Sequence, residues 1–169
     1  LKIKRDKNEI IISSAFYAPW KEDKNFSSFY KKIKNLTLLD NKRLYTLWYL
    51  SCDLKNINAN ILDIGCLQGG AGFLMSKANK KGNTYLFDTF EGFLEEEKIH
   101  KKKHFVYKNL HIIRSNIKKF KLRNIKIYKC KFPYEVNSSI KKKKFKLCHL
   151  DVNTYKSTKK SFEFVKNRL

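Results

Sequence analysis

The stretch that decides the fold is an apolar strand followed at once by a glycine-rich turn, Asn60-Ile61-Leu62-Asp63-Ile64-Gly65-Cys66-Leu67-Gln68-Gly69-Gly70. A short apolar run of this kind is typical of a strand that is buried on both faces of a parallel sheet. Gly65 allows a sharp turn and a close approach to a ligand, and Gly69 and Gly70 leave room at the start of a helix. We therefore expect a strand up to Gly65 and a helix over residues 71–80, closed by Gly82.

Elements of both kinds continue along the chain. Three more apolar runs have strand character, and they span residues 84–88, 125–128 and 145–151. An apolar stripe from Leu38 to Leu50 predicts a helix that has Asp40 as its candidate N-cap and ends near Asp53. A final amphipathic helix carries Phe162, Phe164, Val165 and Leu169. The charged segment 93–120 is expected to hold one or two helices. Residues 1–35 show no sustained period, and residues 15–20 are interpreted as a docking segment rather than a regular element.

Strands that alternate with helices predict β-α-β units, and hence an α/β fold with a parallel sheet and flanking helices. Ligands of such sheets bind at the carboxyl ends of the strands. Residues suited to a ligand stand at three of these ends, namely Gly65, Asp88 and Asp151. Each of the three alone would also fit an ordinary turn or helix cap. Together they predict a ligand site at one edge of the sheet.

The chemistry of the turn narrows the ligand. The glycines do not follow the spacing of a dinucleotide-binding loop, and no Lys-Ser or Lys-Thr pair marks a nucleoside triphosphate loop. The carboxylate of Asp63 would repel a pyrophosphate, but it suits a cationic or hydroxyl-bearing ligand such as the methionine end of S-adenosylmethionine. Asp88, about 20 residues farther on, fits hydrogen bonding to both ribose hydroxyls.

Composition excludes several classes of protein. The chain of 169 residues has room for one domain, and 42% hydrophobic and 14% aromatic residues are too many for a disordered chain. No run approaches the roughly 20 apolar residues of a membrane span. The first residues lack the apolar core of a signal peptide, so we expect a cytoplasmic protein.

The net charge of +23 would attract phosphate groups. However, 33 lysines stand against five arginines, beside 15 asparagines and 15 isoleucines, and biased base composition alone explains that pattern. Recognition of phosphates or bases favours arginine, whose planar fork bonds bidentately. The lysine runs at 101–103 and 141–144 are therefore interpreted as solvated surface, with at most nonspecific binding of nucleic acid.

The cysteines and histidines suggest no metal centre. The cysteines form no Cys-x-x-Cys pair and are interpreted as reduced thiols; they are Cys52, Cys66, Cys130 and Cys148. Cys148 and His149 are adjacent on a predicted strand, so their side chains should point to opposite faces. All four histidines are interpreted as surface residues; they are His100, His104, His111 and His149.

Three segments, taken in order, resemble a known family. They are Asp63 to Gly70, then Phe87-Asp88-Thr89-Phe90-Glu91-Gly92-Phe93, then Leu150-Asp151-Val152-Asn153-Thr154-Tyr155-Lys156-Ser157-Thr158. They are similar to the acidic-x-Gly-x-x-x-Gly-Gly, Asp-Ser-Phe-Glu-Gly and Asp-Gly-Asp-x-Tyr-x-Ser-Thr segments of the macrocin O-methyltransferase family. Members of that family are class I methyltransferases that use S-adenosylmethionine on deoxysugar and related hydroxyls. The resemblance covers residues 36–169, and the third segment is its most diagnostic part.

The resemblance implies a Rossmann-like S-adenosylmethionine-binding domain over residues 54–169, behind an N-terminal lid or helical segment over residues 1–53. It implies that Asp63, Gly65 and Gly69 line the methionine end of the cofactor and that Asp88 holds the ribose. Asp151 would lie beside the transferred methyl group, as catalytic base or as metal ligand. The full set of implied cofactor-binding residues is Asp63, Gly65, Gly69, Gly70, Asp88, Thr89 and Phe90.

Departures from the family bear on the metal. Thr89 replaces a serine, and Asn153 replaces the second aspartate of the third segment and is a weaker metal ligand. The family completes a magnesium site with an acidic pair after the next strand, and this sequence ends at Leu169 before such a pair. Asp151 and Asn153 alone supply too few oxygens for octahedral Mg²⁺. We therefore expect an incomplete domain whose C-terminal strands are missing. Its sheet would have an exposed edge strand, and pairing of two such edges would give a homo-oligomer.

The expected function is methylation of a sugar or other small-molecule hydroxyl with S-adenosylmethionine, assisted by magnesium in the full-length form. Two alternatives stay open at this point. The first is an RNA methyltransferase, which the charge alone supports. The second is a non-catalytic remnant that binds the cofactor or a partner. Ser157 and Thr158 are expected to cap the last helix, and Tyr155 either packs under the site or faces the substrate.

Overall fold

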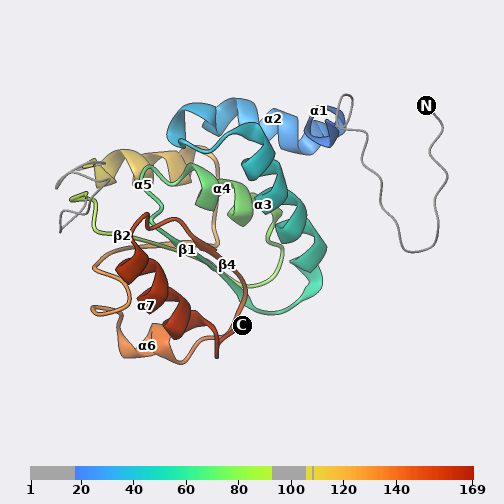
Figure 1. Cartoon of the computed structure of the whole chain (residues 1–169). Helices are drawn as coiled ribbons and strands as arrows, with labels where there is room; N and C mark the ends of the chain where they lie inside the picture. Colours follow the sequence, from blue (N-terminus) through green and yellow to red (C-terminus); the bar gives the residue numbers. More distant parts are fainter. Residues whose placement is uncertain (1–17, 93–105, 108) are drawn as a thin grey trace.

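The four apolar runs form strands that lie side by side in one sheet (Figure 1). The computed structural model describes residues 18–92, 106, 107 and 109–169. Within them the strands are β1 (Asn60–Ile64), β2 (Thr84–Asp88), β3 (Ile125–Lys129) and β4 (Phe145–Leu150). Their order across the sheet is β3-β2-β1-β4, and every pairing is parallel. The predicted α/β fold with a parallel sheet and flanking helices is confirmed.

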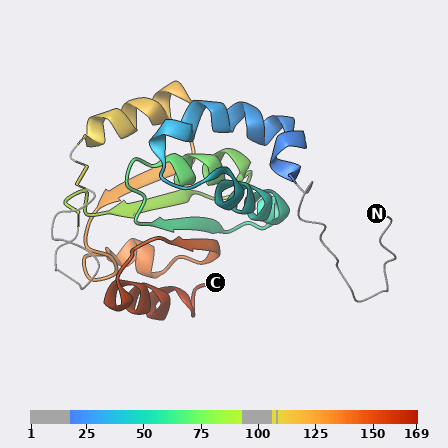
Figure 2. The same ribbon diagram turned by 45° about the horizontal axis from the view of Figure 1, so that its top comes forward.

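Helices cover both faces of this sheet (Figure 2). One face carries α2 (Lys24–Ile33), α3 (Asn41–Asp53), α4 (Gly70–Ala78) and α5 (Leu110–Lys119), and the other carries α6 (Ser138–Lys141) and α7 (Tyr155–Val165). The remaining elements are α1 (Pro19–Glu22) and the 3₁₀ turns η1 (Lys34–Leu36) and η2 (Leu54–Asn56). None of the helices in the described part of the chain has the length and apolar character that crossing a membrane requires.

The helix α2 was not predicted from the sequence. Its apolar residues Phe26, Phe29, Tyr30 and Ile33 follow helical spacing. Asp23 caps it by accepting a hydrogen bond from the amide of Phe26. Pro19 and Trp20, which were read as part of a docking segment, lie in α1; the residues before Ala18 fall outside the described part of the chain.

One apolar core joins the N-terminal helices to the sheet. Phe26 of α2 and Leu44 of α3 are buried in the same cluster as Phe73 of α4 and Leu86 of β2. The predicted boundary between residues 53 and 54 therefore runs through shared packing. A second core lies on the other face of the sheet, beneath α6 and α7.

Several predicted boundaries can be compared with the structure. Asp40 caps α3 as predicted, because its carboxylate accepts from the amides of Lys42 and Arg43. The helix α4 ends at Ala78 rather than Lys80, since Asn79 is already extended and Gly82 turns the chain into β2. The predicted final helix is present as α7, but the prediction that Ser157 and Thr158 cap it was wrong. Its cap is Thr154, whose hydroxyl oxygen accepts from the amide of Ser157.

The cysteines behave as the sequence analysis predicted. All four are free thiols. Cys148 packs against the second core, whereas His149 contacts Asp63 on the opposite face of β4. The two residues therefore do not form a metal-binding pair.

A close backbone approach brings the ends of β1 and β4 together. Gly65 follows β1 with φ of 85°, and a Cβ atom built on it would lie 2.1 Å from the carbonyl oxygen of Asp151. The amide of Asp151 donates to the carbonyl of Ile64 at 2.9 Å. Only glycine combines this positive φ with the lack of a side chain. Gly65 therefore holds the carboxyl ends of two neighbouring strands at one level.

Substituting glycines on either side of the turn tests this constraint. Gly65 and Gly69 both have positive φ, but a Cβ atom on Gly69 would meet only the ring tip of Phe73, at 2.9 Å. A side chain can shift more readily than a strand end. We expect Gly65→Ala to lower the free energy of unfolding by about 2 kcal/mol more than Gly69→Ala, measured by urea denaturation. Equal losses would show that β4 does not constrain Gly65.

Candidate functional site

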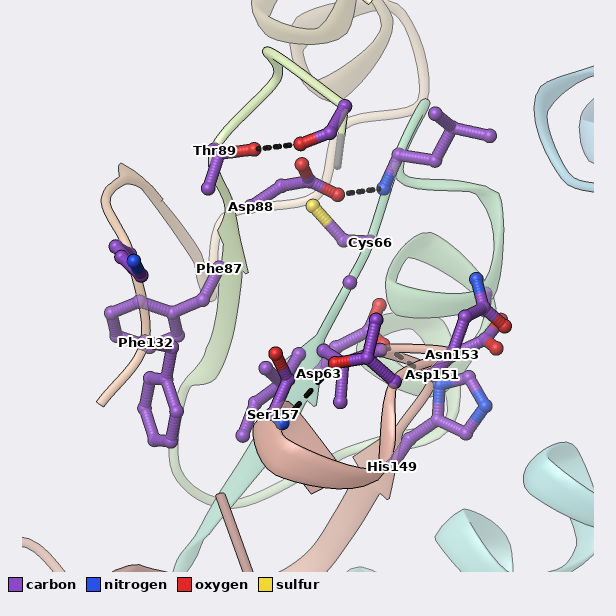
Figure 3. Close-up of a pocket in the computed structure, with 18 of the residues that line it drawn as sticks. Asp63, Cys66, Phe87, Asp88, Thr89, Phe132, His149, Asp151, Asn153 and Ser157 are labelled. Carbon is purple, nitrogen blue, oxygen red and sulfur yellow. Dashed lines mark hydrogen bonds and ion pairs between the residues drawn. The ribbon is translucent and has the colours of Figure 1, made fainter. Parts of the chain in front are cut away.

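A cavity of about 550 Å³ opens at the carboxyl ends of β1, β2 and β4 (Figure 3). This is the edge of the sheet where the strand order reverses, since β2 and β4 lie on opposite sides of β1. Ligands of open α/β sheets bind at such a point, and the volume lies within the usual range for small-molecule sites. A cavity therefore lies at the edge of the sheet where the sequence predicts a ligand site.

Six of the predicted site residues line this cavity together. They are Asp63, Gly65, Asp88, Thr89, Asp151 and Asn153. Three of them are carboxylates, and they come from the ends of three neighbouring strands. The topology thus brings together residues that are up to 90 positions apart in the chain.

Three other predicted residues do not line the cavity. A Cβ atom on Gly70 would lie 2.5 Å from the carbonyl oxygen of Leu36, so the backbone of η1 fills the space beside it. Gly69 lies against the ring of Phe73. The side chain of Phe90 is 2% exposed and belongs to the first core. These positions give no support for direct contact of the three residues with a ligand.

Asp88 ties the ends of β2 and β1 to each other. Its Oδ2 accepts from the amide of Leu67 at 2.8 Å, and its Oδ1 accepts from the amide of Phe90 at 2.7 Å. Burial raises the pKa of Asp88 above its ordinary value, although the two amide bonds act in the opposite direction. Each oxygen keeps a second lone pair, so the carboxylate can still accept hydrogen bonds from a ligand.

Asp63 and His149 form a cross-strand pair at the side of the cavity. They are register partners on β1 and β4, and Asp63 Oδ1 accepts from His149 Nδ1 at 2.8 Å. The Asp63 side chain is fully buried, and its Oδ2 finds no hydrogen-bond donor among the described residues. Gly72 leaves room for this oxygen, because a Cβ atom there would lie 2.8 Å from it.

The prediction that His149 is a surface residue was wrong. Its side chain is only 17% exposed, whereas His111 on α5 is exposed as predicted; His100 and His104 lie outside the described residues. Burial by itself lowers the pKa of His149. The hydrogen bond with Asp63 and the charges of Asp63 and Asp151 outweigh that effect, so the pKa is raised. The imidazole of His149 is therefore protonated more readily beside Asp63 and Asp151 than a free histidine is.

Cys66 is a neutral thiol within this acidic surrounding. Burial raises its pKa well above the ordinary value, and the charges of Asp63 and Asp88 add to the effect. A thiolate nucleophile is therefore disfavoured at this position. Because Asp63 and Asp88 both raise the pKa of this thiol, their negative potentials add at Cys66.

Two groups of lining residues were missed by the sequence analysis. The first, Thr37, Leu38 and Leu39, comes from the segment between η1 and α3, and no local signal marks it. The second comes from the turn after β3 and comprises Cys130, Lys131, Phe132 and Tyr134. The strand-end rule that found Asp88 would also have pointed to this turn. Tyr155 lies outside both groups and is 77% exposed.

The donor set does not fit the expected magnesium ion. Asp151 and Asn153 line the cavity, but no group of three or more Asp, Glu, His or Cys residues within the described ranges could hold a metal. Asp63, another carboxylate that lines the cavity, is engaged by His149. An octahedral ion needs more oxygen ligands than this arrangement offers.

Comparison with known protein families and curated proteins identified no relative of this chain: no protein family model and no curated protein matches the sequence. The resemblance to the macrocin O-methyltransferase family therefore rests on the three segments quoted above.

The pH dependence of stability tests the Asp63–His149 pair. A raised pKa means that the pair stabilises the fold fully below about pH 6.5, and that this contribution is lost as pH rises through the pKa of folded His149. We expect the difference in unfolding free energy between wild type and His149→Gln to be largest below about pH 6.5 and to shrink as the pH rises above it. His111→Gln is the control on an exposed histidine. A difference that grows with pH would contradict the assignment.

Magnesium titration tests the inference that Asp151 and the residues around it do not form a Mg²⁺ site. We expect calorimetric titration of Mg²⁺ into this chain to give no saturable binding with a dissociation constant below the order of 1 mM. Asp151→Asn should give the same trace as wild type. If wild type bound Mg²⁺ tightly and Asp151→Asn abolished this binding, Asp151 would have metal-ligand partners beyond those described, and the inference would be wrong.

Proposed function

We propose that the cavity binds S-adenosylmethionine and that the chain is an O-methyltransferase domain of the class I, Rossmann-like type. The observation that carries the proposal is the meeting of Asp63, Asp88 and Asp151 in one cavity, in a chain whose net charge is +23. Acidic side chains concentrated there, against the charge of the whole molecule, favour a ligand with positive charge and hydroxyl groups. S-adenosylmethionine carries a sulfonium, an ammonium and two ribose hydroxyls.

The residues present fit this cofactor in specific ways. Asp88 lies at the end of β2, where an acidic residue binds ribose hydroxyls in related sheets. Asp63 has a buried oxygen without a donor, which a cationic ligand would satisfy. Leu67 and Phe132 supply apolar lining for a base. A dinucleotide is a poorer fit, because Asp63 stands where a pyrophosphate would have to approach.

The cofactor supplies an electrophilic methyl group when it is bound. The part of the protein is to align an acceptor hydroxyl and to take up its proton. Asp151 is the proposed base, since it lines the cavity after β4 and its backbone is fixed by the hydrogen bond to Ile64. No metal takes part in this account.

The acceptor class follows from the cavity and from the resemblance. The volume suits a small molecule next to a cofactor rather than a folded nucleic acid. Lysines also contribute little to the lining, with Lys131 and Lys156 against the three carboxylates. An RNA substrate would require more positive charge around the reacting atoms. We therefore favour a sugar or another small hydroxyl compound.

Cofactor binding can be measured without knowing the acceptor. We expect Asp88→Ala to weaken binding of S-adenosylhomocysteine at least about hundredfold in calorimetry, because two charge-assisted hydrogen bonds are lost. Asp53→Ala removes an equal charge from an exposed position at the end of α3 and should leave the affinity unchanged. Thermal melts of both variants separate loss of binding from loss of fold. Unchanged affinity of folded Asp88→Ala would refute the ribose assignment.

A further inference from the structure

A second hollow lies at the opposite end of α4 from the cavity. It has a volume of about 690 Å³ and is lined by residues of α2, the C-terminal halves of α3 and α4, η2 and the end of α5. Its floor includes the aromatic side chains of Phe29, Trp48 and Phe120. Because α4 begins beside the cavity and ends beside this hollow, the two sites are separated by the length of the helix.

Lysines dominate the border of this hollow. Six of its thirteen lining residues are lysines, against 33 of 169 in the whole chain. They come from separate elements and are Lys32, Lys55, Lys77, Lys80, Lys119 and Lys121. The enrichment shows that the high lysine content of the chain does not by itself explain the cluster.

Within the part of the chain that the structure describes, no acidic side chain lines the hollow to balance these charges. Asp23 lies near it, but its oxygens accept from Trp48 Nε1 and from the amide of Phe26. Burial is the main cause that raises the pKa of Cys52 in the hollow, and the charge of Asp23 adds to it while Lys55 and Lys80 oppose it. The last effect indicates that ammonium groups from two separate segments lie near one thiol.

Helix ends explain only part of the cluster. Lysines are common at helix C-termini because each terminus carries about −0.5 of an elementary charge. The C-termini of α3, α4 and α5 border the hollow, and together they offset less than two of the six positive charges. The surplus remains even if Asp23 is counted with them. A multiply charged anion would complement it.

We propose that this hollow binds a compact chain of phosphate groups, such as a triphosphate. Lysine binds phosphate as a point charge and needs no planar fork. The volume suits a small ligand, whereas single-stranded nucleic acid needs a longer track and exposed aromatic rings for its bases. Phe29 and Trp48 are only 6% and 7% exposed, so they offer no stacking surface.

The test uses inorganic tripolyphosphate in calorimetry at about 150 mM salt, where nonspecific attraction is screened. We expect K77Q/K119Q to weaken binding at least tenfold. The matched control, K141Q/K142Q, removes the same charge from exposed positions in and just after α6 and should stay within twofold of wild type. Thermal melts confirm that both variants are folded. Absence of binding, or equal loss in both variants, would overturn the proposal.

Two further ligands identify the source of the phosphates. Competition by ATP equal to that of tripolyphosphate would support the proposal and show that a nucleoside adds nothing, while stronger competition would support it with a nucleotide as the ligand. A single-stranded RNA 12-mer that binds more tightly than both, through Lys77 and Lys119, would overturn it in favour of nucleic acid. Neither result depends on cofactor binding in the cavity.

Discussion

The carboxyl edge of the sheet depends on the close approach of two backbones, those of Gly65 and Asp151. Because Gly65 has no side chain and adopts positive φ, the carbonyl of Asp151 can lie against it, and the amide of Asp151 can bond to Ile64. β1 and β4 then end at one level. On the other side, Asp88 bonds to the amide of Leu67 and joins the end of β2 to the same turn. Three strand ends and their carboxylates therefore border one cavity.

Charge is distributed unevenly along α4. At its first turn the cavity gathers three carboxylates, one of them paired with the half-buried His149. At its last turn the lysine-bordered hollow carries a surplus of positive charge. A molecule with a net charge of +23 thus has an acidic site at one end of a single helix and a basic site at the other. Two ligands of opposite charge would be kept apart by this arrangement.

Local signals in the sequence were sufficient for the fold class and for the four strands. The apolar runs predicted all four strands, because burial on both faces leaves an uninterrupted hydrophobic signature. Gly65, Asp88 and Asp151 were predicted to meet because strand ends lie at one edge, and all three line the cavity. What escaped prediction is tertiary. The burial of His149 follows from its register with Asp63, the crowding of Gly70 follows from the path of η1, and Thr37 reaches the cavity only through the packing of α2 and α3.

The central claim is that an adenosyl cofactor binds where Asp88 joins β2 to the turn after β1. The most direct measurement is a titration of the ¹⁵N-labelled chain with S-adenosylhomocysteine, followed by amide chemical shifts. The amides of Leu67 and Phe90 donate to Asp88, so they report any new bond to its oxygens. We predict that these two signals and that of Gly65 shift together and saturate at one equivalent. Shifts confined to other parts of the chain, or no shifts, would contradict the account.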